Sequence, residues 1–195
     1  MDVKLKNHDN SEEMLNELNL KTNLKKIGHS LIVLSGKGGV GKSTVSVNLA
    51  QGLLLQGYTV GLLDVDLHGP SLAKMLGIEG QPLGKQISDG RPSPVQVHEN
   101  FYALSIATLL QSPDQPVVWR GPMKYGAIRQ FLMDIEWPEI DFLVIDSPPG
   151  TGDEPLSVCQ IIEKVDGAVI VATPQDVALA DARKTIKFEK KIPVM

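Results

Sequence analysis

A short glycine-rich segment contains the residues best suited to bind phosphate. Residues 36–43 read Gly-Lys-Gly-Gly-Val-Gly-Lys-Ser, between the apolar run Leu31–Leu34 and the helical pattern that begins at Thr44. Glycines let consecutive backbone N–H groups point into one concavity at a helix N-terminus, where they can hold a polyphosphate. The pattern therefore predicts a nucleotide-binding loop made of Gly36, Lys37, Gly38, Gly39, Val40, Gly41, Lys42, Ser43 and Thr44.

Two side chains of this loop have predicted roles in the chemistry. We expect Lys42 to reach the outer phosphates of the bound polyphosphate and the Ser43 hydroxyl to ligate Mg²⁺. The alternative is a glycine-rich turn that binds nothing. That alternative does not explain why the strand, the spacing, the lysine and the serine of a Walker A loop all occur together.

Three aspartates lie at the ends of apolar segments and are candidate partners of this loop. Asp146 ends the run Phe142–Asp146, a Walker B pattern, and a carboxylate there can hold Mg²⁺ through the waters of the ion. Asp64 and Asp66 end an earlier run, where a turn of the backbone can bring one of them toward the phosphates. Solvated turn residues are the alternative interpretation of that pair.

The segment after Asp146 has the composition of a conformational switch. Ser147–Asp153 contains two prolines, which stiffen it, and two glycines, which free it again. We expect this segment to sense the γ-phosphate through its backbone groups. Asp153 has an alternative role as the cap of the helix entered at Pro155.

Several single residues are weaker candidates, each with a structural alternative. His68 is a candidate ligand or proton carrier, although a lone histidine beside a Gly-Pro turn is more often structural. Arg120 can meet phosphate or a partner's carboxylate, or only hold its turn. Cys159 is interpreted as a small buried residue rather than a redox or metal thiolate. Pro174 and Gln175 follow an apolar strand and are candidates for contact with the adenine base.

Apolar runs and amphipathic segments alternate along the chain. Near-continuous Val/Ile/Leu strands of this kind indicate a parallel sheet covered on both faces, so the expected fold is a doubly wound, mainly parallel, Rossmann-like three-layer α/β domain. The stretch 77–99 is rich in Gly and Pro and is predicted to be a surface loop with room for one hairpin. The expected strands are Leu31–Leu34, Thr59–Asp64, Phe101–Ile106, Phe142–Asp146 and Ala168–Ala172. The expected helices are Lys42–Leu55, Ser71–Leu76, Pro122–Met133, Pro155–Glu163 and Asp176–Lys190.

The two ends of the chain differ from this central pattern. Residues 1–28 are polar and form a predicted N-terminal arm, with a short helix over Ser11–Lys26 whose apolar stripe contains Met14, Leu15, Leu18 and Leu24. Residues 29–195 form the predicted ATPase domain. Its last residues, Lys191–Met195, resemble the start of another core strand, so we expect the domain to be incomplete at its C-terminus.

Composition excludes several classes of protein. The chain has 195 residues, 42% of them hydrophobic, which suits one α/β domain. Its formal net charge of −4 provides no basic field for nucleic acid, and no apolar run is long enough for a membrane helix. The N-terminal residues are charged and contain no apolar signal-peptide core. We therefore expect a cytoplasmic protein without nucleic acid or membrane partners.

The additional lysine of the loop, Lys37, points to a narrower class. The order Lys-Gly-Gly-Val-Gly-Lys-Ser resembles the deviant Walker A motif of MinD, ParA and the nitrogenase iron protein. The resemblance implies a homodimer in which this lysine contacts the ATP of the partner and contributes to catalysis with Lys42. It also implies that Asp66 orients or deprotonates the attacking water, and that Asp64 lies near Ser43 and Mg²⁺.

Five phrases narrow the resemblance to the Mrp/ApbC family of ATP-binding iron-sulfur cluster carriers. They are SGKGGVGKST, DVDLHGPS, WRGPMK, IDSPPGTGDEP and ATPQDVAL, in this order. The resemblance implies slow, switch-like hydrolysis of ATP to ADP and phosphate. It further implies transfer of a cluster, expected to be 4Fe-4S, to apoproteins together with cluster-assembly factors.

One feature departs from that family. The family places a Cys-x-x-Cys pair shortly after the point where this sequence stops, and thiolates are the ligands such a cluster needs. Cys159 is the single cysteine of the chain and matches no family ligand, so no cluster ligands are predicted within it. Two alternatives stay open: a MinD/ParA-like positioning or partition ATPase, and a truncated nucleotide-binding fragment.

Overall fold

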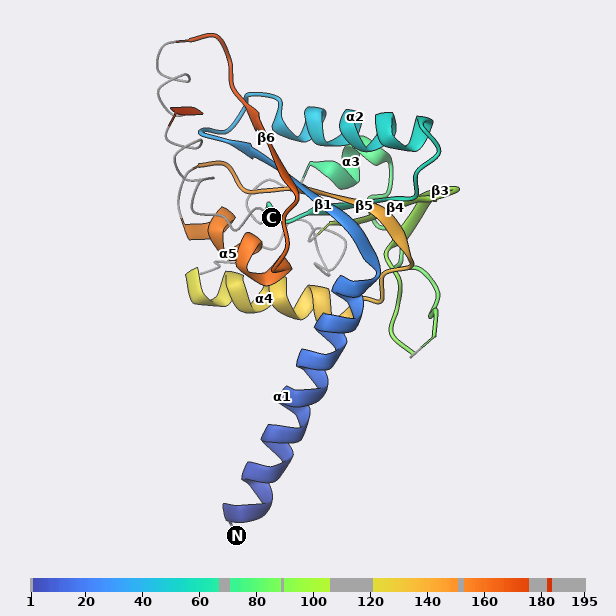
Figure 1. Cartoon of the computed structure of the whole chain (residues 1–195), viewed down its shortest axis with the longest axis vertical. Helices are drawn as coiled ribbons and strands as arrows, with labels where there is room; N and C mark the ends of the chain where they lie inside the picture. Colours follow the sequence, from blue (N-terminus) through green and yellow to red (C-terminus); the bar gives the residue numbers. More distant parts are fainter. Residues whose placement is uncertain are drawn as a thin grey trace.

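The protein is built around a twisted sheet, shown in Figure 1. The computed structural model describes residues 2–66, 71–88, 90–105, 121–150, 153–175 and 182–183. Its sheet has the strand order β3-β4-β2-β5-β1-β6, and every neighbouring pair is parallel except the antiparallel pair of β3 and β4. The strands are β1 Ile27–Ser35, β2 Val60–Asp64, β3 Val95–His98, β4 Phe101–Ser105, β5 Ile140–Asp146 and β6 Gly167–Val171.

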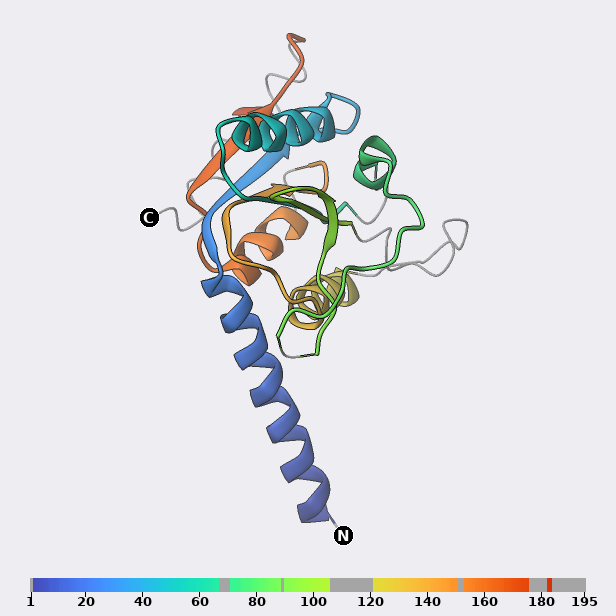
Figure 2. The ribbon, with the colours of Figure 1, turned by 90° about the vertical axis from the view of Figure 1, so that its right-hand side faces the viewer.

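Helices cover both faces of this sheet. Figures 1 and 2 show α2 and α3 on one side and α4 and α5 on the other. The expected three-layer, doubly wound α/β architecture is therefore confirmed. The helices are α1 Asp2–Lys25, α2 Lys42–Leu55, α3 Leu72–Leu76, α4 Gly121–Asp134 and α5 Asp153–Ile162.

Alternation along the strands divides the core into two layers. In β1, Ile32 and Leu34 belong to the apolar cluster under α4 and α5, whereas Val33 belongs to the cluster under α2 and α3. Successive side chains of a strand point to opposite faces, so a strand covered on both sides needs apolar residues at every position. This requirement explains the unbroken apolar runs in the sequence.

The strand order brings three carboxyl ends together. β5 lies between β1 and β2, with Asp146 in register with Val33 of β1 and with Asp64 of β2. The loop after β1 and the acidic ends of β2 and β5 therefore meet at one edge of the sheet. In open α/β sheets this edge is where ligands bind.

The structure differs from the expected elements at the sheet edge. Val95–His98, expected to be loop, forms β3, a short strand that turns at Asn100 and pairs with β4. Asn100 has φ of 59°, a left-handed conformation that asparagine tolerates better than most residues. β1 also begins at Ile27, four residues before the expected start, because Ile27 pairs with Ile140. The expected helix Asp176–Lys190 lies outside the described residues, apart from 182–183.

The N-terminal helix α1 extends beyond the expected Ser11–Lys26 and projects away from the sheet (Figure 1). Its last turns pack on α4, where Leu20 is buried and the Asn23 amide donates a 2.6 Å hydrogen bond to the Leu132 carbonyl. The predicted apolar stripe is wrong as a single surface. Leu24 packs against the core, but Met14, Leu15 and Leu18 are exposed on another side of the helix.

None of the helices in the described ranges combines the length and the apolar character needed to cross a membrane.

Candidate functional site

The loop after β1 presents open backbone to its surroundings. Gly39 and Gly41 have φ of 76° and 90°, conformations that side chains rarely allow. A Cβ atom added at Gly38, Gly39 or Gly41 would have no neighbouring heavy atom within 4 Å. The N-cap residue of α2 is Gly41, which has no side chain to accept hydrogen bonds from the first N–H groups of the helix. An uncapped helix N-terminus beside open glycines suits an anion.

A cavity of about 290 Å³ lies over this loop. Seven of the predicted site residues line it: Gly38, Gly39, Gly41, Lys42, Ser43, Thr44 and Asp66. Four other residues complete the lining, namely Ser35, Ser71, Met75 and Pro149. Six predicted site residues are not in this lining: Gly36, Lys37, Val40, Asp64, Asp146 and Pro174. The cavity therefore combines the loop with the end of β1, the start of α3 and the segment after β5.

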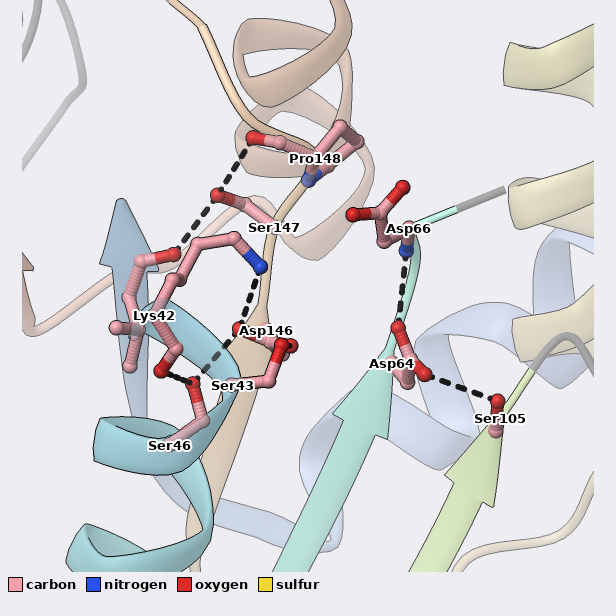
Figure 3. Close-up of polar contacts among 10 residues, drawn as sticks. Lys42, Ser43, Ser46, Asp64, Asp66, Ser105, Asp146, Ser147 and Pro148 are labelled. Atoms are coloured by element: carbon pink, nitrogen blue, oxygen red, sulfur yellow. Dashed lines mark hydrogen bonds and ion pairs between the residues drawn. The ribbon is translucent and has the colours of Figure 1, made fainter. Parts of the chain in front are cut away.

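Asp146 is the centre of a buried polar cluster, shown in Figure 3, that includes the cavity-lining residues Lys42 and Ser43. Its carboxylate accepts hydrogen bonds from Lys42 Nζ at 2.8 Å, Ser43 Oγ at 2.6 Å and Ser46 Oγ at 2.8 Å. The side chain of Asp146 is 1% exposed and that of Lys42 is 7% exposed. A buried carboxylate is tolerated when a cation and several donors surround it, as they do here.

Asp64 lies beside Asp146 on the next strand but in a different environment. It accepts hydrogen bonds from the Ser105 hydroxyl at 3.0 Å and from the backbone N–H of Asp66 at 3.1 Å. Burial raises the pKa of Asp64 to about 7, and the nearby charge of Asp146 contributes to the increase. In Figure 3 these contacts lie on the β4 side, away from Ser43.

Asp66 and the segment after β5 face the cavity from the other side. Asp66 lines the cavity, and Figure 3 shows its carboxylate on the same side as Ser147 and Pro148. The Ser147 hydroxyl donates a 2.7 Å hydrogen bond to the Val33 carbonyl, and the Gly150 N–H donates to the Ser35 carbonyl at 2.8 Å. The first part of the predicted switch is thus attached to the end of β1.

The Lys37 side chain bonds another residue of the same chain. Its Nζ donates a 3.2 Å hydrogen bond to Oε1 of Gln175, in the segment that follows β6. Pro174, predicted to contact adenine, is exposed beside Gln175. The sequence suggested base contact for this segment and gave no sign of its contact with Lys37.

Two members of the site were missed by the sequence. Ser46 lies one helical turn after Lys42, and Ser105 ends β4 in register with Asp64. A polar residue at the end of a buried strand, or four residues after the Walker lysine on the covered face of a helix, is the signal that would have identified them.

Of the four remaining candidates, Cys159 alone has a described side chain. His68 and Arg120 lie outside the described residues, and α5 begins at Asp153, whose side chain is not described. Cys159 is buried, and desolvation raises the pKa of its thiol to about 11, as expected for an unreactive core residue. Among the described side chains, no group of three or more His, Cys, Asp or Glu residues is arranged to hold a metal ion.

The parallel sheet, the glycine loop at a helix N-terminus and the buried strand-end aspartate together define a P-loop NTPase. Comparison with protein families specifies which one. The family model described as "ParA: NUBPL iron-transfer P-loop NTPase" matches residues 26–195, and the chain belongs to this family. The resemblance to iron-sulfur cluster carriers seen in the motifs is thereby confirmed.

Known proteins similar to the chain include a curated relative and two solved structures. An iron-sulfur cluster carrier protein of Methanocaldococcus jannaschii is 48% identical over 176 residues, covering 90% of this chain and 60% of the relative. A nucleotide-binding protein of Archaeoglobus fulgidus, solved with ADP, is 40% identical with a TM-score of 0.76, covering 92% of this chain and 68% of that one. The septum site-determining protein MinD of Pyrococcus horikoshii, solved with Mg-ADP, is 26% identical with a TM-score of 0.60, covering 85% and 66%. The chain thus spans about 60% of the length of the curated relative.

Proposed function

We propose that this chain binds and hydrolyses MgATP as the nucleotide switch of an iron-sulfur cluster carrier. The observation that carries the proposal is the buried cluster of Lys42, Ser43 and Ser46 around Asp146, at the uncapped N-terminus of α2. The name of the Methanocaldococcus jannaschii relative supports the carrier role. The ADP and Mg-ADP with which the two similar structures were solved support the nucleotide and the ion.

The site residues fit MgATP by their chemistry. Mg²⁺ takes oxygen ligands and retains several waters. The Ser43 hydroxyl is therefore suited to bind the ion directly and the Asp146 carboxylate to hold it through its waters, with Asp64 next to Asp146 on the neighbouring strand. The bound ion would neutralise charge on the outer phosphates. The Lys42 ammonium has three donors, and therefore it can meet a phosphate while it keeps its bond to Asp146. The open N–H groups of the glycine loop hold the phosphates by hydrogen bonds.

Hydrolysis requires a water molecule in line with the γ-phosphate. Asp66 lines the cavity, is only partly buried, and is proposed to orient or deprotonate that water. Lys37 is proposed to contact the nucleotide of a second copy in a homodimer. Lys37 does not line the cavity of its own chain, and its ammonium bonds Gln175 instead, which supports a role outside that cavity.

The switch itself is proposed to act through the segment after β5. Ser147 and Gly150 are bonded to the last residues of β1, directly before the phosphate loop. A change at the γ-phosphate therefore has a short covalent and hydrogen-bonded route to this segment. We propose that the segment transmits the nucleotide state to the dimer, and that the dimer loads or releases its cluster accordingly.

The cluster and its recipients are the less direct part of the proposal. A 4Fe-4S cluster needs thiolate ligands, and the one cysteine of this sequence is buried with a raised thiol pKa. We therefore place no cluster ligand among the described residues. Apo iron-sulfur proteins and cluster-assembly factors are the proposed partners, and the cytoplasm is the proposed location.

A positioning ATPase of the MinD type is the alternative. It is less well supported, because the solved MinD structure has 26% identity and a TM-score of 0.60, against 40% and 0.76 for the Archaeoglobus fulgidus protein.

The experiment that tests the site is replacement of its buried lysine. Lys42→Ala should abolish ATP binding measured by isothermal titration calorimetry, because it removes the phosphate contact and leaves Asp146 without its cation. The matched control is Lys85→Ala, which removes an exposed lysine far along the chain and should leave ATP affinity unchanged. Equal ATP affinity in Lys42→Ala and the unmodified protein would refute the assignment.

A further inference from the structure

The sheet places the loop of β1 and the segment after β6 side by side. The two strands are parallel neighbours, and Ser35, the last residue of β1, is in register with Val171, the last residue of β6. Lys37 follows Ser35 by two residues, and Gln175 follows Val171 by four. Both segments therefore leave the sheet at the same edge. Their contact is a consequence of strand pairing rather than of two long side chains meeting by chance.

The segment after β6 is shaped to present Gln175 to Lys37. The Gln175 N–H donates a 2.8 Å hydrogen bond to the Thr173 carbonyl across Pro174, which closes a tight turn. Proline restricts the backbone at the centre of that turn. Gln175 is exposed, and its Oε1 accepts the 3.2 Å hydrogen bond from Lys37 Nζ. The backbone that carries the acceptor is thus constrained by the turn at Pro174.

We propose that Gln175 is a positioning residue for Lys37: it retains the Lys37 ammonium within its own chain and so opposes its extension to a second copy. This inference rests on the proposed role of Lys37 across a nucleotide-bound homodimer. The Nζ atom occupies one place at a time, so Lys37 reaches a partner's nucleotide only after its bond to Gln175 breaks. The bond is therefore a small, built-in cost of dimer formation.

The size of the effect follows from the exposure of the pair. A hydrogen bond between an ammonium and a neutral amide at the surface contributes little net free energy, since water competes for both groups. Its loss should change a coupled equilibrium by about two- to five-fold. A carboxylate in place of the amide would form an ion pair with Lys37 and strengthen the contact by a similar factor.

The test uses two variants of the full chain that change the contact in opposite directions. Gln175→Leu removes the acceptor, and Gln175→Glu replaces it with a charged acceptor. Each dimer breaks two such contacts, one per chain, so the two factors multiply. Sedimentation analysis of the MgATP-dependent monomer–dimer equilibrium should show a dimer about 4- to 25-fold tighter in Gln175→Leu and weaker in Gln175→Glu. Steady-state ATP turnover at saturating nucleotide should follow the same order. Gln160→Leu, an exposed glutamine on α5, is the matched control and should change neither quantity.

The double variant Lys37→Ala/Gln175→Leu separates this inference from the function on which it rests. If Gln175 acts through Lys37, the double variant has the dimer affinity and turnover of Lys37→Ala alone. A Lys37→Ala protein with unchanged turnover contradicts the proposed function itself. A second outcome overturns only the positioning role: Lys37→Ala loses ATP turnover as proposed, but the dimer affinities of Gln175→Leu and Gln175→Glu are equal or change in the same direction. A weaker ATP affinity without a change in dimerisation would show base contact instead, and it also overturns the role.

Discussion

Asp64 and Asp146 occupy equivalent places on neighbouring strands, yet their surroundings differ. They are in register with one another, and each side chain is buried. Asp146 has a lysine ammonium and two hydroxyls as donors, whereas the hydrogen-bond donors of Asp64 are a hydroxyl and a backbone amide, neither of which carries a charge. Burial accordingly raises the pKa of Asp64 to about 7. The comparison shows that the partner supplied by the phosphate loop, more than position on the sheet, decides which carboxylate is suited to hold charge.

The largest difference between the two carboxylates is expected when Asp146 is neutralised. Asp146→Asn leaves the buried Lys42 ammonium without its counter-charge, so the free energy of unfolding should fall by about 3 to 5 kcal/mol. The affinity for Mg²⁺ in the presence of ATP should fall by about 10- to 100-fold. Urea unfolding and Mg²⁺ titration of ATP binding measure the two effects. Asp64→Asn is the matched control, and an equal loss of stability in both variants would remove the distinction between the two carboxylates.

The raised pKa of Asp64 predicts that its contribution to the free energy of unfolding depends on pH. Below the ordinary carboxyl pKa of 3.8 the Asp64 side chain is protonated in both the folded and the unfolded state, and above a pH of about 7 it is ionised in both. Between these values the unfolded state loses its proton and the folded state keeps it, so the free energy of unfolding falls as pH rises. The contribution of this one group is up to about 4 kcal/mol.

Asp64→Asn should remove that contribution. The measurement is urea unfolding without nucleotide at several pH values between 4 and 8, in the unmodified protein and in the variant. As pH rises, the free energy of unfolding of the unmodified protein should fall relative to that of Asp64→Asn. A difference that is constant over the whole range would mean that Asp64 is already ionised in the folded protein at low pH.

The smallest expected effects come from the hydroxyl donors. Ser46→Ala removes one of the three donors to Asp146 and should lower the free energy of unfolding by about 1 to 2 kcal/mol. Ser105→Ala removes the hydroxyl from Asp64, and that loss should raise the pKa of Asp64 further and extend the pH-sensitive window upward. Chemical denaturation at pH 6 and pH 8 compares the two variants. The loss of stability in Ser105→Ala should differ between the two pH values, and an equal loss at both would contradict the raised pKa of Asp64.

Local patterns were sufficient to predict the centre of the sheet. The helix Lys42–Leu55 has the bounds that its sequence indicates, and the phosphate loop precedes it as expected. Asp146 was found because a strand-end carboxylate after four apolar residues is itself a local signal. These features depend on residues adjacent in sequence, so no knowledge of strand order was needed.

Features that depend on strand order or helix docking could not be predicted in the same way. The contact between Lys37 and Gln175 exists because β6 pairs with β1, and the sequence does not specify that pairing. The N-terminal helix shows the same limit. Met14 and Leu18 form the more apolar pattern in the sequence of α1, but the helix docks on α4 through Leu20 and Asn23. The buried Asn23 amide needs acceptors, and carbonyls at the end of α4 provide them.

The distance in sequence between the loop and its carboxylate has a consequence for synthesis of the protein. Lys42 and Asp146 are 104 residues apart, so the ribosome completes the glycine loop long before it adds the aspartate that pairs with the lysine. At about 5 to 20 residues per second, this interval lasts on the order of 5 to 20 s. During that time the emerging polypeptide has a phosphate loop but no partner for its lysine. Nucleotide can therefore assist folding only after β5 has entered the sheet between β1 and β2.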